Sequence, residues 1–309
     1  DSELNRNLSF EEVYAFEDDL LGCPYIGMTY SSNDNNLFIS SRENAPAGST
    51  TEEEVFKLSL DSYQLMRKNV SPGGFITKQL TTINDTLVSI GGTEFKFYDT
   101  SFEYAGEKSY GNNFTLSKFG IATHNNDTYI LGGYRVDGPS RENKKIRKLR
   151  GNITGNQFEE FINTTETMIG ASGAIVNERL HVFGGALYED FEATNKIFIY
   201  PLNNPQSYEE FSMTVKADVT FVHKYGEMIL VAGHKGLYGT DKTSFVGLFD
   251  TTTNTFEEIK TNLDSESGTK AIHQMIVKED KIIVLFGHKA SSQLPMSKWS
   301  ILSADLLKD

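Results

Sequence analysis

Apolar and polar positions alternate in short runs along the whole chain, and no stretch has the three-to-four-residue apolar period of a long helix. An apolar strand that runs into a small or glycine-rich stop occurs repeatedly, at intervals of roughly 50 residues. The copies are 37–41 (LFISS), 87–92 (LVSIGG), 129–133 (YILGG), 180–185 (LHVFGG), 229–234 (ILVAGH) and 283–288 (IVLFGH). The chain is therefore expected to be a series of repeated units.

Each unit contains the same order of elements. A first apolar strand leads through a tight turn such as 125–127 (NND), 177–179 (NER) or 278–280 (KED) into the strand with the stop. A polar loop and an alternating strand follow, and a short last strand carries an aromatic residue and two glutamates. Four strands per unit predict an all-β chain, a six-bladed β-propeller with four-stranded blades.

The sixth unit, residues 271–307, provides three strands before the chain ends. The aromatic-Glu-Glu pattern of the missing fourth strand occurs at residues 10–13 (FEEV), as it does at 158–161, 208–211 and 256–259. We expect an N-terminal strand at about residues 8–16 to complete the last blade, so that residues 1–309 form one propeller domain without open sheet edges.

These residues give the chain a resemblance to the kelch-repeat β-propellers over nearly its whole length. The double glycine of that family is present at 91–92, 132–133 and 184–185, and becomes Gly-His or Ser-Ser in the other units. Phe198 and Phe249 stand where the family has later aromatic residues, and Trp299 is the single tryptophan. The resemblance implies the fold and no single activity, because such propellers include intracellular adaptors, extracellular binding proteins and a few enzymes.

Composition narrows the choice of partner. The formal net charge of −13 disfavours nucleic acid and anionic membranes, and no apolar run approaches the ~20 residues that cross a bilayer. Cys23 is the single cysteine, which excludes an intrachain disulfide. The six histidines have no metal-ligand spacing, and no catalytic triad or nucleotide-binding glycine motif is present, so we expect no metal, no cofactor and no enzymatic activity.

Sequons for N-glycosylation indicate a secreted protein. They occur at Asn7, Asn69, Asn84, Asn113, Asn126, Asn152 and Asn163. The chain begins at Asp1 rather than methionine, as a chain does after removal of a signal peptide. We expect glycans to cover the early blades and to leave the later ones bare.

Candidate binding residues lie in loops that follow the second strand of each unit, over residues 42–54, 134–144, 186–195 and 235–243. Tyr134, Arg135, Arg141, Tyr188 and Tyr238 are side chains of the kind that anchor protein interfaces.

A second candidate is a basic patch on the same face. Arg42, Lys235 and Lys289, with His234 and His288 beside two of them, follow the second strands of units that are neighbours in a closed ring. Such a patch is able to receive a carboxylate or sulfate, and the alternative is that these are solvated loop residues.

The sequence thus predicts an extracellular, non-enzymatic recognition or assembly module that holds a protein or glycan partner through its loops. A stand-alone module and a subunit of a larger extracellular assembly both fit. The alternatives are a propeller enzyme with an active site in the central channel and a cytoplasmic kelch-type adaptor.

Overall fold

The computed structural model describes residues 3–16, 27–31, 35–42, 52–72, 79–83, 86–91, 94–99, 102–109, 116–125, 127–135, 143–149, 159–166, 168–235, 243–263, 270–288 and 299–308. Within these residues the regular secondary structure consists of β-strands and one short 3-10 helix, η2 (Pro205–Ser207). The prediction of an all-β chain is confirmed. None of the described segments forms a helix that is long and apolar enough to cross a membrane.

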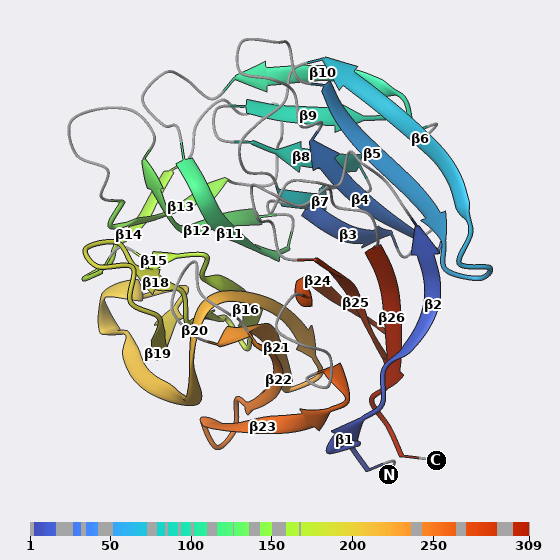
Figure 1. Ribbon diagram of the computed structural model, residues 1–309. Helices are drawn as coiled ribbons and strands as arrows, with labels where there is room; N and C mark the ends of the chain where they lie inside the picture. Colours follow the sequence, from blue (N-terminus) through green and yellow to red (C-terminus); the bar gives the residue numbers. More distant parts are fainter. Residues whose placement is uncertain are drawn as a thin grey trace.

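The strands form small twisted sheets arranged around a ring, as in a β-propeller (Figure 1). Four of these sheets are separate and have four antiparallel strands each. The first contains β3 (Gly27–Ser31), β4 (Asn36–Arg42), β5 (Glu52–Ser59) and β6 (Leu65–Pro72). The second contains β7 (Gln79–Ile83), β8 (Thr86–Ile90), β9 (Glu94–Tyr98) and β10 (Tyr104–Ser109). The third contains β11 (Leu116–His124), β12 (Asp127–Arg135), β13 (Lys145–Leu149) and β14 (Glu159–Asn163).

The fourth of these sheets, named here the closing sheet, joins the two ends of the chain. It contains β24 (Lys270–Lys278), β25 (Lys281–His288), β26 (Trp299–Asp305) and β2 (Glu11–Phe16). The N-terminal β2 pairs antiparallel with the C-terminal β26, in the position expected for the FEEV segment. Outside the sheet, Leu4 bridges Leu307, so that the two termini lie side by side (Figure 1).

The structure differs from the prediction of six separate blades, because eight of the ten remaining strands form one eight-stranded sheet, and β15 (Met168–Ile169) and β18 (Ala186–Leu187) pair as a separate two-stranded sheet. The strands of the eight-stranded sheet are β16 (Ser172–Val176), β17 (Arg179–Phe183), β19 (Thr194–Pro201), β20 (Glu209–Tyr225), β21 (Met228–Lys235), β22 (Thr243–Asp250), β23 (Thr255–Thr261) and β1 (Asn7–Leu8). The physical reason is β20, which pairs with β19 along its first part and with β21 along its second. Ala217 pairs with Thr194 of β19 and with Lys235 of β21, so the sheet continues through this strand.

Tight turns join the first two strands of most sheets, as the sequence predicts. In the turn between β16 and β17 both Asn177 and Glu178 have positive φ, of 50° and 55°. This is the geometry of a two-residue hairpin turn whose twist matches the flanking strands. Asn125 and Glu279 have positive φ at the corresponding turns of two other sheets.

The apolar core lies between neighbouring sheets. One cluster joins Ile283 and Ile301 of the closing sheet to Leu37 and Leu58 of the first sheet, and equivalent clusters join the other neighbours. The first strands of neighbouring sheets lie close together. A Cβ on Gly120 of β11, for example, would lie 2.1 Å from the carbonyl oxygen of Ala171, directly before β16. A single sheet does not bury its own apolar faces, so the ring folds as a stack of sheets.

Candidate functional site

The loop face lies at the ends of the second strands, after β4, β12, β17, β21 and β25, where the sequence predicts the binding residues. One described part of this face is a small hairpin formed by residues 186–193. β18 (Ala186–Leu187) pairs with β15 (Met168–Ile169), and Ala186 also bridges Ala193. The amide of Leu187 donates to the carbonyl of Glu192 over 2.9 Å, and the amide of Phe191 donates to the carbonyl of Leu187 over 2.9 Å. The hairpin is therefore a hydrogen-bonded unit that presents residues 188–191 at its tip.

The tip carries an aromatic cluster, defined as Tyr134, Tyr188 and Phe191. The ring centroid of Tyr188 lies 6.2 Å from that of Tyr134 and 5.9 Å from that of Phe191. Tyr134 comes from the end of β12 and the other two from the hairpin, so the cluster spans two neighbouring sheets. Both tyrosines are half-buried, and Phe191 is 40% exposed. Large aromatic side chains that stay exposed in this way are typical anchors of interfaces.

Acidic side chains surround the hairpin tip. Glu189 and Asp190 are exposed, and the Asp190 carboxylate accepts a hydrogen bond from the amide of Glu192 over 2.8 Å, which orders the tip. Glu192 forms an ion pair of 2.6 Å with Lys216. No Lys or Arg of the described residues pairs with Glu189 or Asp190, so both charges face solvent.

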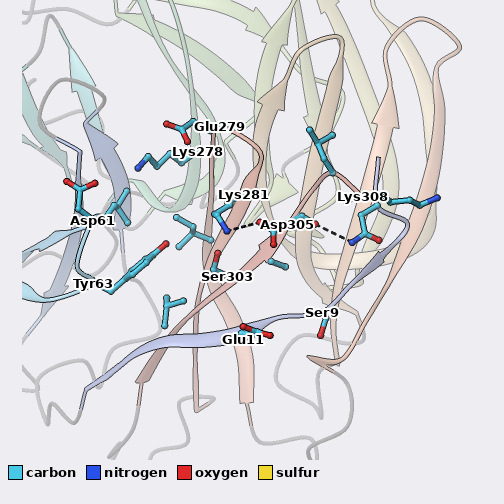
Figure 2. Close-up of a pocket in the computed structure, with 16 residues that line it drawn as sticks. Ser9, Glu11, Asp61, Tyr63, Lys278, Glu279, Lys281, Ser303, Asp305 and Lys308 are labelled. Atoms are coloured by element: carbon cyan, nitrogen blue, oxygen red, sulfur yellow. Dashed lines mark hydrogen bonds and ion pairs between the residues drawn. The ribbon is translucent and has the colours of Figure 1, made fainter. Parts of the chain in front are cut away.

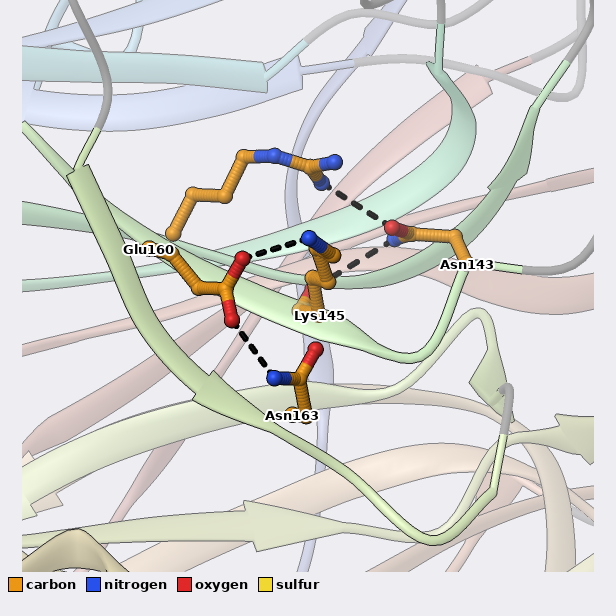
Figure 3. Close-up of polar contacts among 5 residues, drawn as sticks. Asn143, Lys145, Glu160 and Asn163 are labelled. Carbon is orange, nitrogen blue, oxygen red and sulfur yellow. Dashed lines mark hydrogen bonds and ion pairs between the residues drawn. The ribbon is translucent and has the colours of Figure 1, made fainter.

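A polar network supports the Tyr134 side of the loop face (Figure 3). The Asn143 side chain is buried and donates to the carbonyl of Gly132 over 2.6 Å, and its oxygen accepts from Arg147 over 2.9 Å. These bonds fix the start of β13 next to the end of β12. The sequence gives no signal for this role, because Asn143 lies in a polar stretch with no recognisable turn pattern.

Charge pairing continues along the outer edge of the same sheet. Lys145 donates to Glu160 over 2.5 Å and thereby lowers the pKa of that carboxyl, and Asn163 donates to its other oxygen over 2.5 Å. Figure 3 shows Glu160 between these two partners. Asn163, a predicted sequon asparagine, is exposed beside the first residue of β13.

Of the predicted basic patch the structure describes the side chains of His234 and Lys235, and neither provides a free surface charge. His234 does not lie on the surface beside Lys235, because its side chain is 7% exposed and turns into the contact with the closing sheet. There its Nε2 donates to the carbonyl of Ile272 over 2.5 Å, and its ring lies 6.2 Å from that of His273. Lys235 is half-buried and its ammonium forms an ion pair with Glu258, so its charge is neutralised.

Several predicted residues lie outside the described part. These are Arg141, Tyr238 and Lys289, the sequon asparagines Asn84, Asn113, Asn126 and Asn152, and the single cysteine, Cys23. For Arg42, Asn69, Arg135 and His288 the structure describes the strand and not the side chain. Of the sequon asparagines, Asn7 and Asn163 are fully described, and both are exposed. Among the described residues no group of three His, Cys, Asp or Glu side chains forms a candidate metal site.

Comparison with known proteins gives a likeness of fold. No protein-family model matches the chain, and no curated protein matches it. Among solved structures, one entitled "Structure of YjhT" superposes with a TM-score of 0.60 and 11% sequence identity, over 75% of this chain and 83% of that chain. The match extends to 565 chains of solved structures, so the arrangement is common and does not select a function. The likeness shows that the chain has a fold shared with YjhT, and nothing beyond the fold.

Proposed function

We propose that this protein is a secreted, non-enzymatic recognition module that binds a protein partner through its loop face. The aromatic cluster of Tyr134, Tyr188 and Phe191 is the observation on which the proposal rests. It offers an apolar anchor on a rigid hairpin, and the exposed carboxylates of Glu189 and Asp190 stand beside it.

The chemistry of the cluster favours a protein over a glycan. The rings of Tyr134 and Tyr188 are inclined by 31° and those of Tyr188 and Phe191 by 57°, so they form no single flat platform for a sugar ring. An uneven apolar surface with an acidic rim suits a protein that inserts an apolar side chain and surrounds it with Lys or Arg. The net charge of −13 adds a long-range attraction for such a basic surface.

We also propose that the ring is a six-bladed propeller of the kelch type. The eight-stranded sheet divides at Ala217 into two groups of four strands, with β20 contributing to each, and β1 added at its edge. Together with the four separate sheets this gives six blades. Apolar clusters between the two groups, and between each group and its other neighbour, support the division.

The test compares capture of partners by the wild-type protein and two variants. The first variant, Tyr188→Ser/Phe191→Asn, removes two rings of the cluster, and asparagine tolerates the positive φ of 58° at position 191. The control, Leu65→Ser/Met66→Ser, changes two side chains that are 45% and 59% exposed on β6, away from the loop face. Immobilised protein is exposed to fluid from the native source, and captured proteins are quantified by mass spectrometry.

We expect the wild type and the control to retain one or more basic proteins. The cluster variant should capture at least about tenfold less of the same proteins. Retention of these proteins should weaken as salt is added, because salt screens the attraction between the carboxylates of Glu189 and Asp190 and a basic partner. Equal capture by all three proteins would contradict the proposal.

A further inference from the structure

A pocket of about 690 Å³ opens beside the closing sheet, at the opposite ends of the strands from the loop face. The closing sheet forms one wall, with Lys281 of β25 and Asp305 of β26. The turn between β5 and β6 of the first sheet contributes Asp61 and Tyr63, and the N-terminal β2 contributes Glu11 (Figure 2). The volume lies within the range of about 300–1,000 Å³ of small-molecule sites.

Four carboxylates and three ammonium groups line this pocket, and two of the ammonium groups are neutralised within the protein. The Lys281 ammonium donates to the carboxylate of Asp305 over 2.7 Å. The Lys308 ammonium forms an ion pair of 2.7 Å with Glu3, which is not part of the lining. These two pairs leave one lining ammonium group against three lining carboxylates.

The charge that remains is negative and comes from two carboxylates. Lys278 and Glu279 are neighbours in the chain, so their opposite charges largely offset each other at one end of the pocket (Figure 2). Glu11 and Asp61 are left, and neither forms an ion pair with a Lys or Arg of the described residues. A ligand that matches the pocket therefore carries positive charge.

Both of these carboxylates are within reach of a ligand, because the side chains of Glu11 and Asp61 are exposed. Asp61 accepts a hydrogen bond from the side-chain amide of Asn35, which fixes the carboxylate in place without neutralising its charge. The pKa of Lys281 is raised, first by its hydrogen bond to Asp305 and also by the charge of Glu11. The surroundings of the pocket thus already stabilise one ammonium group.

Each of the two carboxylates has an apolar neighbour in the lining. Tyr63 follows Asp61 by two residues and Val13 follows Glu11 by two, and both side chains are half-buried. Methylene groups pack on such surfaces while a charged end stays with its partner, and an aromatic ring attracts a nearby ammonium group.

The two carboxylates come from different parts of the chain, Glu11 from β2 and Asp61 from the turn after β5. A ligand with a single ammonium group neutralises one of them and leaves the other. A ligand with two ammonium groups joined by methylene groups neutralises both and places its apolar middle on the pocket wall.

We propose that this pocket binds an aliphatic diamine or polyamine, with Glu11 and Asp61 each holding one ammonium group and the methylene chain lying on Val13 and Tyr63. The site lies away from the loop face, and its test does not depend on the partner proposed there.

The experiment measures binding of a defined panel by calorimetry, near neutral pH and at low ionic strength, where exposed charges are least screened. The probes are the diamines from 1,3-diaminopropane to 1,6-diaminohexane and spermidine, each at up to about 10 mM. The comparators butylamine, butane-1,4-diol and succinate keep a four-carbon chain and change the charge at its ends.

The proteins are the wild type, Glu11→Gln, Asp61→Asn, the double variant and the control Glu107→Gln. Glu107 is an exposed carboxylate on β10, the outer strand of the second sheet, as Glu11 is on β2, the outer strand of the closing sheet. It does not line the pocket, so the control removes the same charge from elsewhere on the protein. Thermal unfolding of each protein without probe reports whether the fold is kept.

We expect at least one diamine or spermidine to bind more tightly than all three comparators. Glu11→Gln and Asp61→Asn should each weaken its binding about three- to tenfold, because each removes one of two charged partners, and the double variant should weaken it further. Glu107→Gln should bind like the wild type. Three results would overturn the proposal: no binding of any diamine or of spermidine, a comparator that binds as tightly as the best of them, or pocket variants that bind no more weakly than the control.

Discussion

Phe10 and Asn262, which are 252 positions apart, hold each other through two hydrogen bonds. The amide of Phe10 donates to the Asn262 side-chain oxygen over 2.8 Å, and the Asn262 side chain donates to the carbonyl of Phe10 over 3.0 Å. This exchange lies between β1, which runs parallel to β23, and β2, which completes the closing sheet. The N-terminal segment is thus fastened to two neighbouring parts of the ring at once.

Asn262→Ala should loosen this closure. It removes both bonds, leaves the backbone groups of Phe10 without that partner, and should destabilise the protein by about 1–3 kcal/mol. Hydrogen exchange should show the loss of protection concentrated in β2 and the N-terminal residues, since these open without unfolding the other sheets.

The control for this prediction is Asn195→Ala. The Asn195 side chain donates to the carbonyl of Met213 over 3.2 Å, inside the eight-stranded sheet. This variant should lose stability without a change of protection in β2. If Asn262→Ala leaves β2 as protected as the control does, the closure does not depend on this pair.

Gly132 and Gly226 should respond differently to the same substitution. Both have positive φ, of 58° and 60°, yet a Cβ on Gly132 would lie 2.1 Å from the carbonyl oxygen of Met168, whereas nothing lies within 4 Å of one on Gly226. Gly226→Ala should therefore cost only the backbone strain, about 1–2 kcal/mol. Gly132→Ala adds a collision between two neighbouring sheets and should cost more than about 3 kcal/mol in urea unfolding. Similar losses of stability for the two variants would show that the neighbouring sheets move apart and accommodate a side chain at position 132.

Local chemistry explains why the strands and turns were predictable. Paired turn residues such as Asn177 and Glu178 specify a hairpin within a few positions, and the FEEV segment resembles the other outer strands. The eight-stranded sheet was not predictable in this way. Residues 209–225 contain no Gly or Pro that would end a strand, so β20 continues from one group of strands into the next.

The arrangement of the site residues was harder to predict than the strands, because it depends on contacts between parts of the chain that are far apart in the sequence. Tyr134 and Tyr188 were both identifiable as loop aromatics, but their contact depends on how two sheets pack. His234 looked like a loop residue because it stands between a glycine and a lysine, and the packing of the closing sheet buries it instead. The pocket that Glu11 and Asp61 share has no counterpart in the sequence pattern, because it forms only where the N-terminal strand and the first sheet meet the closing sheet.

Buried histidines should make the protein less stable in mild acid. His181 is 1% exposed, its Nδ1 donates to the carbonyl of Arg179 over 2.9 Å, and burial lowers its pKa to about 4. The unfolded chain binds a proton on this residue near pH 6.5, whereas the folded protein does so only near pH 4. The folded protein therefore has its full stability above about pH 6.5, where His181 is neutral in both states. As the pH falls toward 4 it loses up to about 3 kcal/mol, because the unfolded chain takes up a proton that the folded protein does not.

Urea unfolding of the wild type and His181→Gln between pH 8 and pH 4 checks this expectation. The variant should lose stability at neutral pH and show a shallower decline on acidification. His223, whose pKa burial also lowers to about 4, should account for part of the decline that remains, so the double variant should be flatter still. An unchanged slope in His181→Gln would assign the acid sensitivity to other groups.

The proposal that the protein is secreted makes the most direct prediction. Asn7 and Asn163 are exposed sequon asparagines, so protein from its native source should carry N-glycans at both, and its mass should fall when these are removed enzymatically. A glycosylated amide keeps one N–H, so Asn163 is still able to donate to Glu160, and the sheet edge should remain intact. Asn7→Gln and Asn163→Gln, expressed through a secretory pathway, should each remove one glycan without changing the unfolding temperature. Native protein without glycans at these two exposed asparagines would instead favour the cytoplasmic adaptor.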